Sequence, residues 1–324
     1  MLVALGLGVG LQRWATSPSD SASDPLLEAL IHQPKAEKPT GQRPGAQTQA
    51  QTQSQSQAKG LEGIQAHRAA PVASGAPQRF ALAEPAQAPP LALEIRVALL
   101  SAGLSPSLGA TGPWQLRGPS GAVLGQGGAG DPVPFGLARQ WGEAWLSTGP
   151  QHALLVNGVP YDGSLRLVPK DGGIQLVNHL SLERYIAAVV GSEMPSGWPM
   201  EALRAQAVAA RSYALAHMAR PASRHWHLGD TTRWQAYKGM ARLNSRTQQA
   251  ATSTAGMILS YQGGIVESLY AANRQISLEA HGHLGASMSQ HGARELAEQG
   301  FPYNAILGRY YQGASLARLR SGAS

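Results

Sequence analysis

The chain has 324 residues, of which 26 are lysine or arginine and 19 are aspartate or glutamate, giving a net charge of +7. It contains no cysteine, which excludes a disulfide scaffold, a thiolate nucleophile, an iron–sulfur cluster and a cysteine-ligated zinc site. Only 14% of the residues are charged, and glycine (38) and proline (22) are frequent, which indicates that part of the chain does not fold.

The first segment, residues 1–14, contains the apolar run LVALGLGVGL. This run is too short to span a bilayer, which needs about 20 residues, but it matches the apolar part of a secretory signal. The basic residues that usually precede such a run are missing, and Arg13 follows it instead. We expect an export signal or anchor here, with a buried or artefactual segment as the alternative.

The second segment, residues 15–90, is low in complexity and includes the run QTQAQTQSQSQ. Its apolar residues are too sparse to offset the conformational entropy that folding costs. The composition predicts a disordered linker that tethers a folded domain.

From residue 91 the pattern becomes that of a folded domain. Residues 93–99 (LEIRVAL) have the alternation of a strand, and further short apolar runs are separated by turn residues such as Asp162-Gly163 and Asp171-Gly172-Gly173. We therefore predict a small antiparallel sheet over residues 91–179, with a structural or substrate-platform function.

A helix is predicted after Ser181, which can cap it. Leu182, Tyr185, Ile186, Val189 and Val190 follow with the spacing of an amphipathic helix. Gly191 and Pro195 are expected to end this helix, which leaves Glu193 just beyond it.

A second helix is predicted from Pro199, which suits a first turn, to about Met218. It is rich in alanine, so neighbouring elements can approach closely and it should be buried on several sides. Arg204 and Arg211 are seven residues apart and share one face. Either both reach solvent, or both hold an anionic or polar ligand near Glu193, because an unpaired buried charge is costly.

The run SLERYIAAVVGSEMPSGWPMEALRAQAVAARSYAL, which starts at Ser181, resembles the signature of the stage II sporulation protein D family, also called the SpoIID/LytB domain. Asp230-Thr-Thr, Gln235-Ala-Tyr-Lys-Gly and Met288-Ser-Gln-His-Gly-Ala resemble later blocks of the same family in the same order. The resemblance covers about residues 93–315.

That family includes lytic transglycosylases, which cleave the MurNAc–GlcNAc bond of peptidoglycan, and enhancers of cell-wall amidases. The resemblance implies that Glu193 is the catalytic acid and that Arg204 and Arg211 act beside it. It also implies a set of substrate-binding residues: Trp198, Gln206, Asp230, Gln235, Tyr237, His283, Ser289 and Gln290.

One carboxyl group suffices for this chemistry. It protonates the glycosidic oxygen, the 6-hydroxyl of the sugar attacks its own anomeric carbon, and the same carboxylate serves as acid and then base. Such a glutamate works best with a pKa raised by apolar surroundings, which Met194 and Trp198 can supply unless they only pack in the core.

The chain departs from the family at two places. Some members have a cysteine-ligated zinc site where this chain has Gly229, Arg233 and Trp234, and His225 with His227 is a weak metal pair, so we expect no metal and no cofactor. The C-terminal motif is also altered, because the position of the family histidine falls on Leu284, so that His281 or His283 would have to replace it.

Three functions remain open: a lytic transglycosylase, a non-catalytic glycan-binding enhancer of a cell-wall amidase, and a structural envelope protein. Glycan strands are the expected partner, with an amidase and a membrane as further ones. Nucleic acid is not expected, because no recognised motif or long basic run is present. We expect export to the cell envelope or periplasm, with attachment to the membrane through the N-terminus.

The predicted fold class is α+β. A single domain is expected over residues 91–315, with a β-rich part (91–179), a helical part (180–315) and a C-terminal tail (316–324).

Overall fold

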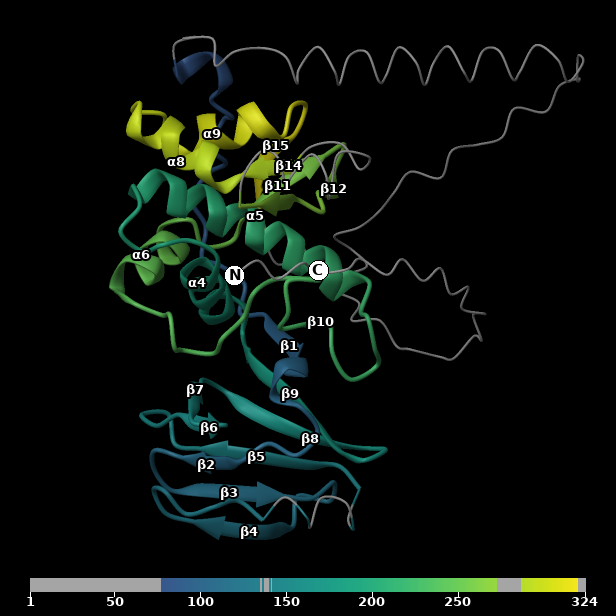
Figure 1. Ribbon diagram of the computed structural model, residues 1–324. Coiled ribbons are helices and arrows are strands. Elements are labelled where there is room, and N and C mark those ends of the chain that lie inside the picture. The colour runs from purple at the N-terminus through teal and green to yellow at the C-terminus, as the bar shows by residue number, and fades with distance from the viewer. Residues whose placement is uncertain (1–76, 135, 137–139, 141, 273–286, 320–324) are drawn as a thin grey trace, which may run out of the picture.

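The structure is a computed structural model that describes residues 77–134, 136, 140, 142–272 and 287–319. A sheet-rich half lies at the bottom of Figure 1 and a helical half at the top, and a long strand pair, β1 and β9, joins them. The α+β class is thus confirmed. The segment predicted as an export signal and most of the predicted linker lie outside the described residues.

The main sheet has seven strands in the order β10-β1-β9-β8-β5-β3-β4. All neighbours are antiparallel except β1 and β10, which are parallel, so a strand from the helical half completes the sheet. The bounds are β1 Glu94–Ala98, β3 Trp114–Arg117, β4 Val123–Gly127, β5 Ala144–Thr148, β8 Ser164–Lys170, β9 Gly173–Ser181 and β10 Leu228–Gly229.

The other strands of the described residues form three smaller sheets: β2-β6-β7, β12-β11-β15 and the parallel pair β13-β14. Their bounds are β2 Leu108–Ala110, β6 Leu154–Val156, β7 Val159–Tyr161, β11 Met257–Tyr261, β12 Gly264–Ile265, β13 Leu269–Ala271, β14 Ser287–Ser289 and β15 Ser315–Arg318. The tail predicted from residue 316 therefore begins too early, because β15 pairs with β11.

The predicted turns are present. Asp171 and Gly172 connect the paired residues Lys170 and Gly173 at the β8–β9 hairpin, where Gly172 has a φ of +81°. Glycine adopts this left-handed conformation without the clash that a Cβ atom causes. Leu165 and Leu167 are buried along β8 and alternate with less buried neighbours, as the strand pattern predicts.

The helices are α4 (Leu182–Glu193), α5 (Met200–Ala219), α6 (Ser245–Ser253), α8 (Gln290–Glu298) and α9 (Tyr303–Tyr310), with short 3₁₀ turns η1 (Pro77–Phe80) and η2 (Leu100–Ala102). Ser181 caps α4, as predicted, and accepts a hydrogen bond from the backbone N–H of Arg184 at 3.3 Å. Pro199 is the N-cap of α5 rather than part of its first turn.

The expected end of α4 at Gly191 is wrong, because the helix continues through Glu193. The glycine is there for a different reason. A Cβ atom at Gly191 would collide with the backbone oxygen of Arg242, so the missing side chain lets the segment before α6 approach α4. Close approach, not helix termination, explains this residue.

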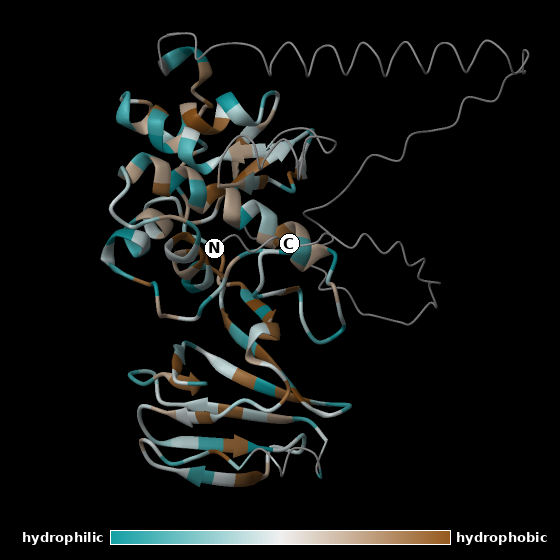
Figure 2. Cartoon of the chain, in the orientation of Figure 1, coloured by the Kyte–Doolittle hydropathy of each residue, from teal (hydrophilic) through white to brown (hydrophobic). Residues whose placement is uncertain are grey.

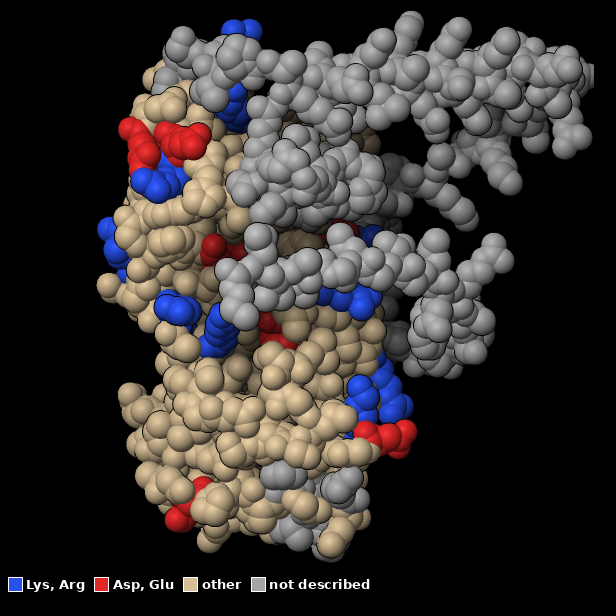
Figure 3. Space-filling model, viewed as in Figure 1, with Lys and Arg blue, Asp and Glu red and all other residues tan. Residues whose placement is uncertain are grey.

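Helix α5 is the centre of the helical half, in contact with α4, α6, α8, α9 and β11. Most of its side chains are buried, in agreement with the prediction from its alanine content. In Figure 2, brown apolar stretches alternate with teal and white ones along the strands of the lower half. Charged side chains are scattered among uncharged ones on the face drawn in Figure 3.

The folded part starts before the predicted domain. Residues 77–90, assigned from composition to the linker, lie against α9, where Asn304 Nδ2 donates to the backbone oxygen of Leu82 at 3.0 Å. The guanidinium of Arg309 lies 5.1 Å from the ring centre of Phe80, and Phe80 and Leu82 pack against the core. No described helix is long and apolar enough to cross a membrane.

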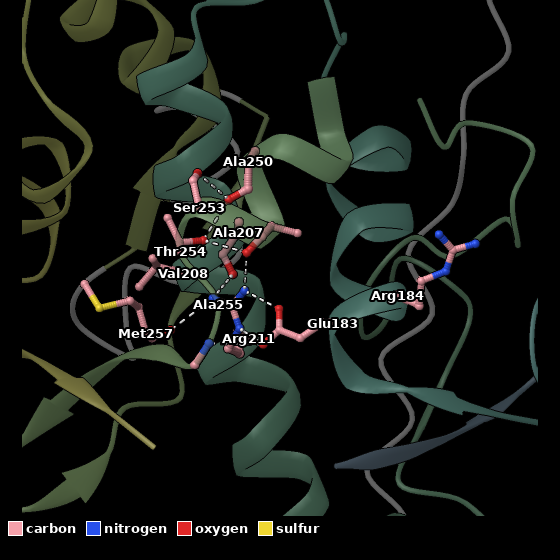
Figure 4. A network of polar contacts seen from close by, with 12 residues as sticks. Glu183, Arg184, Ala207, Val208, Arg211, Ala250, Ser253, Thr254, Ala255 and Met257 are labelled. Atoms are coloured by element: carbon pink, nitrogen blue, oxygen red, sulfur yellow. Dashed lines mark hydrogen bonds and ion pairs between the residues drawn. The ribbon is translucent and has the colours of Figure 1, made fainter. Parts of the chain in front are cut away.

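Arg211 of α5 is fully buried and joins four elements (Figure 4). Its Nη2 lies 2.7 Å from Oε2 of Glu183 at the start of α4, and its Nε donates to Oε1 at 2.9 Å. It also donates to the backbone oxygens of Ala251 on α6 at 3.1 Å and Met257 on β11 at 3.0 Å. The charge is thereby compensated by one carboxylate and by peptide carbonyls.

Removing Glu183 should therefore destabilise the protein strongly. Glu183→Ala leaves a buried guanidinium without its counter-charge, a change that costs about 3–5 kcal/mol. The matched control is Glu298→Ala, which breaks the exposed Arg294–Glu298 pair and should cost less than about 1 kcal/mol. Urea unfolding measures both, and equal losses would contradict a structural role for the Arg211–Glu183 pair.

Candidate functional site

Glu193 is the last residue of α4, and its carboxyl group is partly buried. Its Oε1 accepts a hydrogen bond from the backbone N–H of Ala236 at 2.8 Å. Its Oε2 lies 3.3 Å from Nε2 of Gln290, the first residue of α8. Two segments distant in sequence thus meet at this one carboxyl group.

Burial raises the pKa of Glu193 above its ordinary value, while the hydrogen bonds from Ala236 and Gln290 oppose the increase. No arginine or lysine of the described residues forms an ion pair with it. The carboxyl group therefore stays protonated to a higher pH than an exposed glutamate, as a general acid requires.

Gln206 and Gln290 continue from Glu193 into the core. Gln290 Nε2 lies 3.5 Å from Oε1 of Gln206, and the exposed fractions of the two side chains are 0% for Gln206 and 4% for Gln290. Gln290 therefore lies between Gln206 and the carboxyl group. Contact between Gln206 and a substrate stays a prediction, and in this structure its neighbour is Gln290.

Gln235 and Tyr237 flank Ala236, the residue that binds Glu193. Gln235 Oε1 accepts from Tyr185 Oη at 2.9 Å, and its Nε2 donates to Tyr270 Oη at 2.9 Å and to the backbone oxygen of Ala210 at 3.0 Å. Tyr237 donates to Asn178 Oδ1 at 2.7 Å. Both side chains are buried, so they fix the backbone that presents the Ala236 N–H group.

Trp198 lies across from the start of α8. Its ring centre is 5.0 Å from that of His291, and the guanidinium of Arg294 lies 5.6 Å from the indole. Arg246 Nη2 donates to the backbone oxygen of Trp198 at 2.8 Å, which holds the loop between α4 and α5. Because Trp198 is only partly buried and His291 is exposed, this ring pair borders solvent next to Gln290.

The two arginines of α5 do share a face, but that face packs on α6, and neither arginine forms a hydrogen bond or ion pair with Glu193 in the described part of the chain. Arg204 pairs with Glu201 at 2.7 Å and donates to Ser253 Oγ at 3.0 Å. Arg211 is held by Glu183 and carries no exposed surface. The prediction that they reach solvent is wrong for Arg211, and an action of either arginine beside Glu193 stays a prediction.

Asp230 and Ser289 have local structural partners. Asp230 Oδ1 accepts from the backbone N–H of Leu100 at 2.9 Å, and Ser101 Oγ also donates to this carboxylate, which caps η2. Ser289 is the N-cap of α8 and accepts from the N–H of Gly292 at 3.1 Å. His283, named with them as substrate-binding, lies outside the described residues.

Gly229 and Trp234, the positions at which the family resemblance places cysteines, touch each other. A Cβ atom at Gly229 would lie 2.6 Å from Cζ3 of Trp234 and 2.8 Å from Cδ1 of Leu100. Arg233 lies 5.0 Å from the indole centre, and Trp226 packs edge-on against it at 5.6 Å. An indole therefore occupies the space between the two positions.

The histidine pair is engaged elsewhere. The backbone N–H of Arg96 donates to Nδ1 of His227 at 3.0 Å, and burial with the charge of Arg96 lowers the pKa of His227 to about 3. His225 Nε2 accepts from Arg224 Nε at 2.8 Å. Within the described part of the chain, no group of three or more His, Asp or Glu side chains is arranged to hold a metal ion.

Three contributors to the site were not predicted from the sequence. The N–H group of Ala236 has no side-chain signal, although its neighbours Gln235 and Tyr237 were singled out. Tyr270 meets Gln235 from β13, and burial, followed by the charge of Glu193, raises its pKa well above the ordinary value. His291, whose ring contacts that of Trp198, was not among the predicted site residues.

Comparison with known proteins matches the segment that carries Glu193. Residues 170–261 match the family model described as Stage II sporulation protein. An uncharacterized protein of Brachyspira hyodysenteriae is 37% identical over 123 residues, which cover 38% of this chain and 33% of the relative. The Amidase enhancer of Bacillus subtilis is 33% identical over 102 residues, covering 32% of this chain and 14% of that protein.

Stage II sporulation protein D of Bacillus subtilis is 34% identical over 111 residues, covering 30% of this chain and 32% of that protein. The matches thus span a third or less of each of these relatives. The fold and the site define an α+β domain in which one partly buried carboxyl group at the end of α4 meets α8. Over residues 170–261 the chain is similar to the SpoIID family.

Replacing Glu193 should change stability in a pH-dependent way. A carboxyl group whose pKa is raised by folding stabilises the native state at low pH and loses that contribution as pH rises through the folded value. Glu193→Gln keeps the shape and cannot ionise, so its unfolding free energy relative to wild type should increase from pH 4 to pH 8. Urea unfolding across this range measures the difference, with exposed Glu295→Gln as the control. A flat difference for Glu193→Gln would contradict a raised pKa.

Adding a methyl group at Gly229 should displace the loop that carries Ala236. Gly229→Ala forces the Trp234 ring away, and such overpacking costs about 1–3 kcal/mol. Gly263→Ala serves as a comparison for the loss of a glycine, because it has open space but a φ of +83°. Thermal unfolding and the near-ultraviolet circular dichroism of tryptophan should change together in Gly229→Ala only. An unchanged tryptophan signal would refute the contact.

Proposed function

We propose that this protein acts on peptidoglycan in the bacterial cell envelope, as a lytic transglycosylase that uses Glu193 as its single acid and base. The observation that supports this most directly is a partly buried carboxyl group whose pKa is raised by burial, with no arginine or lysine among the described residues paired to it. A hydrolase of the usual kind needs a second carboxylate within reach of the bond. The transglycosylase reaction needs only one.

The reaction uses Glu193 twice. In the first half, its protonated Oε2 donates to the oxygen of the MurNAc–GlcNAc bond, and the C–O bond to the anomeric carbon breaks. In the second half, the resulting carboxylate takes the proton from the 6-hydroxyl of the same MurNAc, whose oxygen closes on the anomeric carbon. The product is a 1,6-anhydro sugar, and Glu193 regains its proton.

The arrangement around the carboxyl group suits this cycle. The N–H group of Ala236 donates to Oε1, so Oε2 is the oxygen that carries the exchanged proton. Trp198, partly exposed beside His291, provides an aromatic face of the kind on which sugar rings stack. In this proposal Arg211 and Glu183 contribute by fixing α4, not by touching the substrate.

The second candidate is a non-catalytic enhancer of a cell-wall amidase that binds glycan strands. It is favoured by the similarity to a protein named Amidase enhancer, and by the placement of Arg204 and Arg211 away from Glu193. Under both candidates we place the protein outside the cytoplasm, in the envelope, with peptidoglycan as its partner. An amidase partner belongs to the second candidate only.

The test compares wild type with Glu193→Gln on purified glycan strands stripped of peptides. Mass spectrometry of the soluble products should detect 1,6-anhydro ends with wild type and at least about 100-fold fewer with the variant, the range that general acid catalysis contributes. Glu295→Gln, on the exposed side of α8, should release as much product as wild type.

Each other outcome has a clear meaning. Equal release by wild type and Glu193→Gln would exclude this carboxyl group as the acid. No release by either protein, together with co-sedimentation of both with the strands, would overturn the transglycosylase proposal in favour of the enhancer. In that case a purified amidase should digest peptidoglycan faster when the protein is added.

A further inference from the structure

The two oxygens of the Glu193 carboxyl group are not equivalent. Oε1 faces the backbone N–H of Ala236, which can only donate a hydrogen bond. A proton on Oε1 would point at that donor, so the protonated form of Glu193 carries its hydrogen on Oε2. The group that faces Oε2 is the side-chain amide of Gln290.

Gln290 suits only the ionised carboxylate in the observed orientation. Its Nε2 lies 3.3 Å from Glu193 Oε2 and 3.5 Å from Gln206 Oε1, so its two hydrogens serve two acceptors. When Oε2 is protonated, two donors face each other. A half turn of the Gln290 amide replaces the nitrogen with Oε1, which can accept from the carboxyl O–H.

That half turn also affects Gln206. After it, the oxygen of Gln290 would face the oxygen of Gln206, and two acceptors would meet in a buried place. Gln206 holds an unused donor, because its Nε2 is buried and has no hydrogen-bond partner among the described residues. A buried amide nitrogen without a partner is uncommon and costly. Turning Gln206 as well brings this nitrogen to the Gln290 oxygen.

We infer that Gln206 is a positioning residue. The side-chain amides of Gln206 and Gln290 both rotate by half a turn when Glu193 gains or loses its proton. In the ionised form the hydrogen bonds run from Gln290 to Glu193 and to Gln206. In the protonated form they run from Glu193 and from Gln206 to Gln290. The unpartnered nitrogen of Gln206 is the donor that the second arrangement needs.

In the reaction, the hydrogen on Oε2 would leave the Gln290 oxygen for the glycosidic oxygen, and the carboxylate that results would again accept a hydrogen bond from the Gln290 amide. This use rests on the proposed function. The half turn of the two amides depends only on the buried contacts and takes place without substrate.

The test follows the side-chain amides by NMR in the full chain labelled with ¹⁵N-glutamine and with ¹³C-glutamate. The Glu193 carboxyl carbon gives the midpoint of its titration. The side-chain ¹⁵N resonances of Gln290 and Gln206 should both shift with that same midpoint. Gln235 is the internal control, because its amide is fully engaged by Tyr185, Tyr270 and Ala210 and should move much less.

Two variants separate coupling from a direct effect of charge. In Gln290→Met, Glu193 still titrates but the shift of Gln206 should be lost, because the connecting amide is gone. In Glu193→Gln, the shifts of both amides at that midpoint should disappear. A Gln206 resonance that is constant in wild type, or that titrates equally in Gln290→Met, would overturn the inference. No glycan is present, so either result leaves the proposed cleavage reaction to be decided separately.

Discussion

The buried guanidinium of Arg211 is the constraint on which the helical half depends. It cannot remain in the interior without Glu183 and the carbonyl groups of α6 and β11, so these elements must assemble around it. Glu183 lies in the first turn of α4 and Glu193 ends the helix, and a helical stretch of that length spans about 15 Å. Fixing one end of α4 therefore fixes where the other end presents its carboxyl group.

Among the described residues, the groups that form hydrogen bonds with Glu193 are neutral. They are the peptide N–H group of Ala236 and the amide of Gln290, while Arg204 and Arg211 are held in other contacts. Burial raises the pKa of a carboxyl group, and hydrogen bonds from neutral donors lower it. A neighbouring cation would lower the pKa strongly, because it favours the ionised form. This explains how a protein with a positive net charge keeps one of its carboxyl groups protonatable.

Local features were predictable from the sequence. The Ser181 cap, the two helices that follow and the Asp-Gly turns depend on a few neighbouring residues, and the structure contains all of them. Features that depend on distant contacts were not predictable. Gly191 was assigned to helix termination although it serves close approach, and Phe80 and Leu82 were assigned to a linker because their partner α9 lies more than 200 residues away in sequence.

The same limit applies within the site. Glu193 was identified from its motif, and Gln206, Gln235 and Gln290 were predicted to bind substrate, a role that stays a prediction. Their burial was not visible in the sequence. The N–H group of Ala236 could not be predicted, because every residue has one. Only the path of the loop after β10 decides which N–H group reaches the carboxyl group.

The contact of Trp234 with Gly229 bears on how that loop is held in place. The stability of a loop held by a thiolate-bound zinc ion depends on the supply of metal, on pH and on oxidants. The stability of a loop held by an indole packed against a peptide depends on temperature instead, because the stabilisation from apolar burial weakens on cooling. The loop that carries Ala236 is therefore held by carbon contacts in addition to the hydrogen bonds of Gln235 and Tyr237, and the carbon contacts are the part that cold weakens.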